Sequence, residues 1–280
     1  MRVAVVQMNS ASERADNVAR ALGLVDRAVG EGAEFVLLPE YMTFLGPYAR
    51  FPEMCEAAPG PTTGLLSAKA RQHRIYLHGG SLIEKTSQPD RFYNTSTLFD
   101  PHGEMIATYR KVHLFDVNVP GQVTDTESRA VLPGDSLKLA ALPELTLGLS
   151  ICFDLRFPEL YRQLAVAGAE AFVVPSAFAR ATGRAHWEIL LRARAIENHA
   201  YVLAAAQYGR DATGHWRYGH SMIVDPWGQL LAAAPEEGEE VLVTEIRRDI
   251  VLSRRREMPV LSMRRPDVYA SLETGATARD

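Results

Sequence analysis

A cysteine, a lysine and a glutamate each close an apolar, strand-like run, where reactive side chains could meet. Cys152 ends "LTLGLSIC", Glu40 ends "EFVLLPE", and Lys111 ends "EMIATYRK". A charge at the end of a buried strand is costly unless it has a partner or a task. A thiol needs a base or a positive neighbour to act as a nucleophile at neutral pH. Together the three residues could supply a nucleophile, a base and a cation.

Each of the three residues also has an ordinary structural explanation. Cys152 fits a small core residue, because free cysteines are among the most buried side chains. Glu40 could simply end its strand, and Lys111 could be one member of an ion pair on the surface. Taken singly, the structural explanations are better; taken together, the catalytic set is coherent.

The eight histidines provide no recognisable base for the thiol. His113, His186, His215 and His220 lie in segments that favour ordinary structural roles. The chain has no HExxH or CxxC spacing, which disfavours zinc, and no glycine-rich loop for a nucleotide phosphate. A carboxylate is therefore the base to consider, and this chemistry requires no metal or organic cofactor.

The composition is that of an ordinary globular chain. Its 280 residues are 47% hydrophobic and 23% charged, and a formal net charge of −4 gives no general attraction to nucleic acid or anionic lipid. No run reaches the roughly 20 apolar residues that span a bilayer. The two cysteines, Cys55 and Cys152, cannot build a disulfide framework, although a single bridge stays open. We expect a cytoplasmic chain with reduced thiols that binds neither nucleic acid nor membrane.

The chain repeats one order of elements twice. Each half predicts strand, helix, strand, helix and a pair of strands closed by a D-P-x-G turn. The segments are 2–7, 18–29, 34–40, 63–74, 75–83 and 93–100 in the first half, and 145–152, 158–168, 171–177, 186–200, 201–207 and 218–225 in the second. Two such halves predict an α/β fold of two mixed sheets packed face to face with helices outside, a four-layer α-β-β-α sandwich.

The duplication also bears on the site and on domain organisation. Because chemistry in α/β architectures is usually assembled at the carboxyl ends of strands, we expect Glu40 and Cys152 to reach the same end of the sandwich. No linker separates the halves, which predicts one domain over 1–280, with a core to about 262 and a polar C-terminal tail from 263.

Three segments resemble the signature segments of the nitrilase, or carbon–nitrogen hydrolase, superfamily. They are "LLPEY", "YRKVHLFD" and "ICFDLRFPE", in the family's order, and the resemblance covers almost the whole chain. It implies an α-β-β-α sandwich, a Glu-Lys-Cys triad at Glu40, Lys111 and Cys152, and a further site glutamate at Glu127. It also implies a homodimer or a higher homo-oligomer.

The resemblance is greatest to the Nit branch. "RKVHLFDVNVPGQ", "PSAFARATGRAHWEILLRARAIENHAYVLAAAQYGR" and "GHSMIVDPWG" carry it, and within the branch the chain looks most like the deaminated glutathione amidases. The ω-amidases share much of this pattern. Phe153 departs from the tyrosine that follows the nucleophile in many members, which puts a hydroxyl contact in the pocket in doubt.

The implied reaction is hydrolysis of a small, carboxylate-bearing linear amide to acid and ammonia through a cysteine thioester, with deaminated glutathione as the first candidate. Other readings stay open: an ω-amidase acting on α-ketoglutaramate-like acids, a carbamoylase or nitrilase, or a metabolite-binding scaffold that has lost its activity. A thiol redox switch would need Cys55 as its second thiol, and nothing in the sequence places Cys55 near Cys152.

A pocket for such a substrate needs a cation or hydrogen-bond donors for the carboxylate. Arg156, four residues after Cys152, is the first candidate, and an ion pair with Glu159 or Asp154 is an equally good explanation of it. Further candidates for substrate binding are Phe153, through its backbone N–H, and Phe178 and Thr182 in "PSAFARATG".

Overall fold

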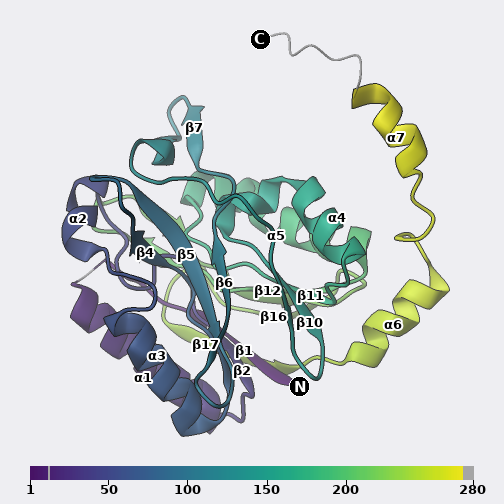
Figure 1. Cartoon of the computed structure of the whole chain (residues 1–280), viewed down its shortest axis with the longest axis horizontal. Helices are drawn as coiled ribbons and strands as arrows, with labels where there is room; N and C mark the ends of the chain where they lie inside the picture. The colour runs from purple at the N-terminus through teal and green to yellow at the C-terminus, as the bar shows by residue number, and fades with distance from the viewer. Residues whose placement is uncertain (12, 274–280) are drawn as a thin grey trace.

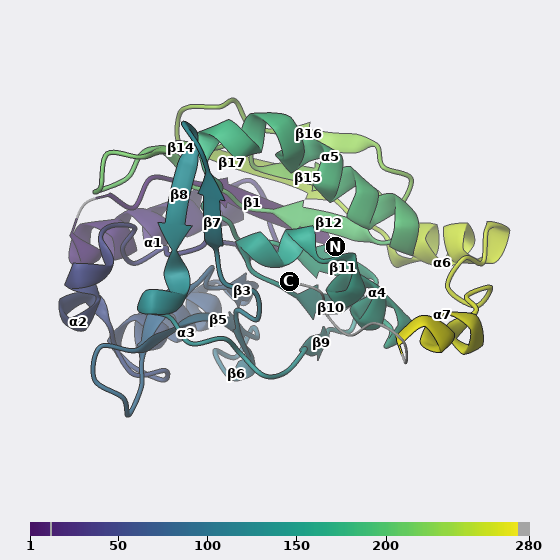
Figure 2. The ribbon, with the colours of Figure 1, turned by 90° about the horizontal axis from the view of Figure 1, so that it is seen from above.

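The computed structural model describes residues 1–11 and 13–273, which form two β-sheets packed face to face, with helices on the outside (Figures 1 and 2). The predicted tail is described as far as helix α7 (Pro266–Glu273), so its last part, 274–280, lies outside the described residues. Helix α6 (Arg248–Glu257) packs at the edge of the second half, where Val251 joins the core, and Figure 1 shows α7 beyond it, away from the two sheets.

The first sheet is built on three parallel strands from the first half of the chain. These are β1 (Arg2–Gln7), β2 (Phe35–Leu37) and β3 (Tyr76–His78). The sheet has the order β17-β1-β2-β3-β5-β4, and β6 also pairs with β5. Its other strands are β4 (Leu82–Lys85), β5 (Phe92–Phe99), β6 (Met105–Arg110) and β17 (Glu240–Glu245).

The second sheet repeats this plan. Its parallel strands are β10 (Thr146–Leu149), β11 (Ala171–Val173) and β12 (Tyr201–Ala204), in the order β16-β15-β12-β11-β10-β9. In each sheet an antiparallel strand pairs with the third parallel strand: β5 pairs with β3, and β15 pairs with β12. The remaining strands are β9 (Leu139–Ala141), β15 (Met222–Val224) and β16 (Leu230–Ala233). The predicted duplication is confirmed.

Helices cover the outer face of each sheet, which completes the predicted four layers. The first sheet carries α1 (Arg14–Gly30) and α3 (Pro61–His73), and the second carries α4 (Pro158–Val166) and α5 (Arg180–Asn198). The smaller elements are α2 (Phe51–Met54), the hairpins β7 (Asp116–Val119) with β8 (Val123–Thr126) and β13 (Tyr208–Arg210) with β14 (Trp216–Tyr218), and three 3₁₀ turns at Tyr48–Arg50, Glu127–Arg129 and Cys152–Arg156.

The core explains why the strands read as continuous apolar runs. Along β1, Ala4 and Val6 pack in one cluster with α1 and α3, whereas Val3 and Val5 pack in the cluster that joins the two sheets. Since successive side chains point to opposite faces, a strand covered on both faces must be apolar throughout. In the described part of the chain, no helix is long and apolar enough to cross a membrane.

Several predicted strands are longer than those in the structure, where β2, β11, β12 and β15 have three or four residues each. Two further boundaries are wrong. The single strand expected at 75–83 is two strands, β3 and β4, because the chain turns at Gly80, which has φ +64°. Residues other than glycine rarely adopt this conformation. The helix expected from residue 186 begins earlier, at Arg180.

Gly80 also lies tightly against the segment that carries Glu40. A Cβ at Gly80 would lie 2.0 Å from the Pro39 carbonyl oxygen, whereas one at Gly214, with φ +85°, would meet nothing within 4 Å. We expect Gly214→Ala to lower the free energy of unfolding by about 1–2 kcal/mol, from backbone conformation alone. Gly80→Ala should cost clearly more, because the backbone must also move. Urea unfolding of both variants measures this, and equal losses would show that space at Gly80 is not limiting.

Candidate active site

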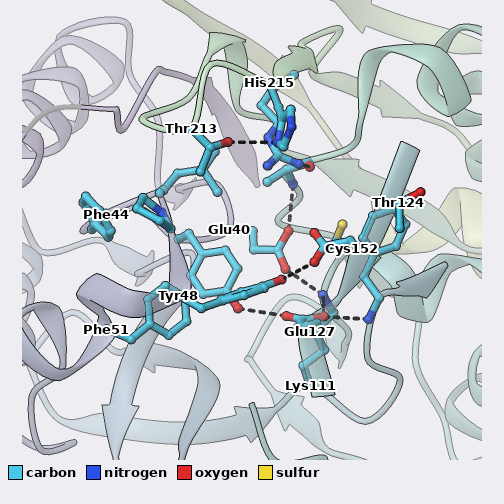
Figure 3. A pocket seen from close by; sticks show the side chains of 18 residues that line it. Glu40, Phe44, Tyr48, Phe51, Lys111, Thr124, Glu127, Cys152, Thr213 and His215 are labelled. Atoms are coloured by element: carbon cyan, nitrogen blue, oxygen red, sulfur yellow. Dashed lines mark hydrogen bonds and ion pairs between the residues drawn. The ribbon is translucent and has the colours of Figure 1, made fainter. Parts of the chain in front are cut away.

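The predicted catalytic side chains meet in one cavity of about 280 Å³ (Figure 3). Glu40, Lys111, Glu127 and Cys152 all line it, and their exposed fractions lie between 1% and 6%. Glu40 follows β2, Lys111 follows β6 directly, and Cys152 follows β10, so strand ends from both sheets supply the site. The expectation that Glu40 and Cys152 reach the same end of the sandwich is met.

Cys152 stands on a sharp turn between β10 and a 3₁₀ turn. Its φ is +47°, a conformation that costs a residue with a side chain about 1–3 kcal/mol unless the surroundings impose it. The Cys152 N–H donates to the Pro175 carbonyl oxygen at 3.0 Å, at the end of β11, which holds the turn in place. The strand and the turn together aim the thiol into the cavity.

Hydrogen bonds fix the Glu40 carboxylate from three sides. Its Oε1 accepts from Asn94 Nδ2 at 2.8 Å and from Lys111 Nζ at 3.0 Å, and its Oε2 accepts from the Ala177 backbone N–H at 2.8 Å. Asn94 comes from β5 and Ala177 from the loop after β11. A carboxylate held in this way cannot turn away from the neighbouring thiol.

Glu127 is the second carboxylate of the site, on the other side of Lys111. Its Oε2 lies 2.9 Å from Lys111 Nζ and also accepts from the Phe115 N–H at 2.7 Å. Its Oε1 accepts from the Tyr41 hydroxyl at 2.8 Å. Burial alone would lower the pKa of Lys111, but Glu127 and Glu40 outweigh it and hold that pKa well above its usual value. Lys111 is therefore charged at neutral pH.

The Cys152 thiol is protonated in the resting site. Burial and then the Glu40 carboxylate raise its pKa well above the usual value, and Lys111 opposes them only in part. A thiol in this state needs a base at the moment of attack. Glu40 is the side chain that raises this pKa most after burial, so the proton acceptor already lies beside the donor.

The predicted substrate-binding residues lie together beside the nucleophile. Phe153, Phe178 and Thr182 line a narrow cavity of about 10 Å³ next to Cys152. The Arg156 guanidinium lies 5.7 Å from the Phe153 ring centre and 5.3 Å from that of Phe178.

The expected alternative for Arg156, an ion pair with Glu159 or Asp154, is wrong. Within residues 1–11 and 13–273 Arg156 makes no ion pair, and its Nη1 lies 3.2 Å from His186 Nδ1. Burial lowers the pKa of Arg156, and only a negative charge on Cys152, which the resting thiol does not carry, would oppose this. The guanidinium thus stands beside the nucleophile without a carboxylate partner.

Sequence reasoning missed several residues of the opposite wall. Tyr48, Thr213, His215 and Arg217 line the catalytic cavity, and the Arg217 Nη1 donates to the Ala177 carbonyl oxygen at 3.0 Å. Arg217 is itself paired with the buried Asp211. Asn94 and Tyr41 were missed as well, although Asn94 had a signal, a polar amide inside an otherwise strand-like run.

A second cavity of about 610 Å³ adjoins the first and shares Thr124, Asp125, His215 and Arg217 with it. The β7–β8 hairpin, the start of α5 and the β13–β14 hairpin form its walls, and Arg180 and Arg184 add further cations. In the part of the chain that the structure describes, no group of three or more His, Cys, Asp or Glu side chains is placed to hold a metal ion.

Replacing Glu40 tests its electrostatic effect on the thiol. Glu40→Gln removes a negative neighbour, so the pKa of Cys152 should fall and alkylation of Cys152 by iodoacetamide should shift to lower pH. Mass spectrometry of the Cys152 peptide across a pH series measures this. Glu53→Gln, at an exposed glutamate outside the cavity, is the control. A shift to higher pH in Glu40→Gln would contradict the placement of this charge.

The comparisons with known proteins agree with this geometry. A family model described as carbon-nitrogen hydrolase matches residues 2–256. The mouse (Mus musculus) protein Omega-amidase NIT2 is 41% identical to this chain over 270 residues, covering 96% of each protein. The crystal structure of Saccharomyces cerevisiae Nit3, a member of branch 10 of the nitrilase superfamily, aligns over 95% of this chain and 96% of its own, with a TM-score of 0.85 and 33% identity.

A solved structure with a covalent adduct is also similar. A glutamate-to-leucine mutant of the amidase from Nesterenkonia sp. AN1 shows covalent addition of the acetamide moiety of fluoroacetamide at its active site cysteine. It is 27% identical to this chain and aligns over 97% of each, with a TM-score of 0.81. The chain therefore belongs to the carbon–nitrogen hydrolase family, in the Nit branch of the nitrilase superfamily, and is a hydrolase of carbon–nitrogen bonds other than peptide bonds.

Proposed function

We propose that this enzyme hydrolyses the ω-amide of a small carboxylic acid, of the α-ketoglutaramate type, through a thioester on Cys152. The observation that carries the proposal is the buried Glu40–Lys111–Glu127 network beside a protonated thiol. Relatives about 40% identical to this chain are named Omega-amidase, which supports ω-amides over the deaminated glutathione that the sequence motifs favoured.

The first half of the reaction forms the thioester. Glu40 accepts the Cys152 proton while the sulfur attacks the amide carbon, and the carbonyl oxygen becomes an oxyanion. Lys111 Nζ and the Phe153 backbone N–H are its donors, and in other enzymes one such donor contributes roughly 3–4 kcal/mol. When the oxyanion collapses, the carbon–nitrogen bond breaks and Glu40 gives its proton to the departing ammonia.

The second half uses the same groups with water. Glu40 takes a proton from water, the hydroxyl adds to the thioester carbon, and the carbon–sulfur bond breaks to release the acid and the thiol. One amide and one water give one acid and one ammonia. Glu127 holds Lys111 in place at 2.9 Å and is not a primary proton carrier, since Glu40 is the carboxylate that acts directly on the pKa of Cys152.

Charge balance supports Arg156 as the partner of the substrate carboxylate. In the catalytic cavity Lys111 faces two carboxylates, Arg217 is paired with Asp211, and Asp125 adds a further acidic group. A substrate anion is repelled there and attracted to an unpaired cation. Arg156 is such a cation, and it lies against Phe153 and Phe178, which border the nucleophile.

Deaminated glutathione is the second candidate, and the second cavity favours it. This compound has the same acyl group as α-ketoglutaramate, but its amide joins a dipeptide. Its hydrolysis therefore releases an amine that carries a carboxylate, and the ammonia expected for this substrate from the sequence is wrong. The adjoining cavity of about 610 Å³, with Arg180, Arg184 and Arg217 in its walls, has room for such a leaving group.

The test is hydrolysis of the two substrates side by side. We expect ammonia from α-ketoglutaramate, and no turnover by Cys152→Ala. A larger kcat/KM for deaminated glutathione than for α-ketoglutaramate, measured by the release of cysteinylglycine, would favour the second candidate. No turnover of either by a folded enzyme whose Cys152 is alkylated normally would refute both.

Arg156→Gln tests the carboxylate partner. We expect KM for α-ketoglutaramate to rise by about tenfold, the usual effect of losing a hydrogen bond to a charged group, with kcat little changed. KM for butyramide, which has no carboxylate, should stay the same. Arg192→Gln, at an arginine of α5 that pairs with Glu188, is the control. An equal rise with butyramide would show that Arg156 shapes the pocket only.

Two statements about the setting belong to this proposal. Cys55 and Cys152 are both free thiols, which suits the reducing cytoplasm. Assembly into a homodimer or a higher homo-oligomer stays a prediction from the family resemblance. One domain with a core to about residue 262 stays a prediction from the sequence, which has no linker between its halves.

A further inference from the structure

Asp154 is a fully buried carboxylate that the reaction above does not use. It lies two residues after Cys152, and its side chain is 0% exposed. A buried charge is costly unless it is fully hydrogen-bonded, so its partners show what it is for.

Four donors converge on Asp154, and three of them flank Lys111. Oδ1 accepts from the His113 backbone N–H at 2.9 Å and from His113 Nδ1 at 2.8 Å. Oδ2 accepts from the Tyr109 hydroxyl at 2.7 Å and from the Ile151 N–H at 2.9 Å. Because a carboxylate only accepts, His113 Nδ1 carries a proton.

Tyr109 and His113 stand two residues before and two residues after Lys111. Asp154 therefore binds the segment that carries Lys111 at two points, one before the lysine and one after it. The same carboxylate binds Ile151 and is the direct chain neighbour of Phe153. The two oxyanion donors, Lys111 Nζ and the Phe153 N–H, come from different halves of the chain and are tied to each other through Asp154.

Aromatic packing reinforces this connection. The His113 ring stacks on Phe157 with centres 3.6 Å apart and planes 9° apart. Phe157 in turn meets the edge of Phe153 at 5.6 Å. The His113 ring is thus held by its hydrogen bond to Asp154 and by its stack on Phe157. Phe157 in turn contacts Phe153, whose backbone N–H is one of the two oxyanion donors.

We propose that Asp154, Tyr109 and His113 are positioning residues that set the separation of the two oxyanion donors, Lys111 and the Phe153 N–H. The inference rests on the proposed thioester chemistry, though not on which amide is the substrate. Weakening the connection slows steps that build an oxyanion and leaves simple alkylation of the thiol unchanged, because alkylation at a saturated carbon forms no oxyanion.

The test compares two reactions of Cys152 in matched variants. Acylation by p-nitrophenyl acetate forms an oxyanion before p-nitrophenolate leaves, and iodoacetamide alkylation does not. Tyr109→Phe and His113→Phe each remove one side-chain bond to Asp154, and the second keeps an aromatic ring on Phe157. Tyr161→Phe is the control, because it removes a buried 2.8 Å bond to Ser150 beside the nucleophile but none to Asp154.

We expect Tyr109→Phe and His113→Phe to slow the p-nitrophenol burst by about tenfold, as small misplacements of catalytic donors do, with alkylation within twofold of the wild type. His113→Asn, which can still donate to Asp154, should recover most of the burst. Tyr161→Phe should lower the free energy of unfolding and leave both the burst and the alkylation of Cys152 unchanged.

Unchanged bursts in both Asp154-facing variants, or an equal loss in Tyr161→Phe, would overturn the inference. A parallel fall in alkylation would overturn it too, because it would point to general loosening of the turn. A wild-type enzyme that gives a normal burst but no ammonia from α-ketoglutaramate would count against the ω-amide proposal and leave this one intact.

Discussion

The site depends on one buried ammonium held between two carboxylates. Lys111 Nζ lies 3.0 Å from Glu40 and 2.9 Å from Glu127, with all three side chains about 2% exposed or less. Removing three charges from water costs several kcal/mol for each ion, and only close pairing and further hydrogen bonds repay it. Asn94, Tyr41 and the backbone therefore follow as requirements. Tyr41 and the Ala177 N–H donate to the oxygens that the ammonium leaves free, and Asn94 donates to the Glu40 oxygen that it shares with Lys111.

This arrangement also determines the state of the nucleophile. Burial and then the Glu40 carboxylate raise the pKa of Cys152, and Lys111 opposes them only in part, so the sulfur keeps its proton at rest. A resting thiolate would need no base but would be a poorer nucleophile, since nucleophilicity falls with pKa. Here the proton moves only over the short path to Glu40 when a substrate carbonyl is in place.

The duplicated fold is what brings these groups together. The first half supplies the base and the cation, and the second supplies the thiol, so the site is complete only when the two sheets pack. Strand periodicity and the repeated D-P-x-G turns predicted the layers, and the three charged or reactive strand ends made a catalytic set coherent. The triad itself and Glu127 were predicted from the resemblance to the carbon–nitrogen hydrolase superfamily. These patterns could not predict the Ala177 N–H or Arg217, because a backbone donor and a contact across 40 residues leave no local pattern. The Arg156 ion pair failed for the same reason, since the better-placed Asp154 was already engaged by Tyr109, His113 and Ile151.

In the proposed function, selectivity follows from where charge is left unpaired. The lysine and the arginine of the catalytic cavity both have carboxylate partners. Lys111 pairs with Glu40 and Glu127, and Arg217 pairs with Asp211. A substrate anion therefore gains little by approaching either cation. Arg156 has no such partner in the described chain, and burial already makes its charge costly, so a bound carboxylate relieves a cost that the empty enzyme bears. The adjoining cavity of about 610 Å³ attracts an anion less strongly. Glu236 neutralises Arg180 and Arg184 in part, so under the proposed function an anionic group gains less there than an anionic acyl group gains at Arg156.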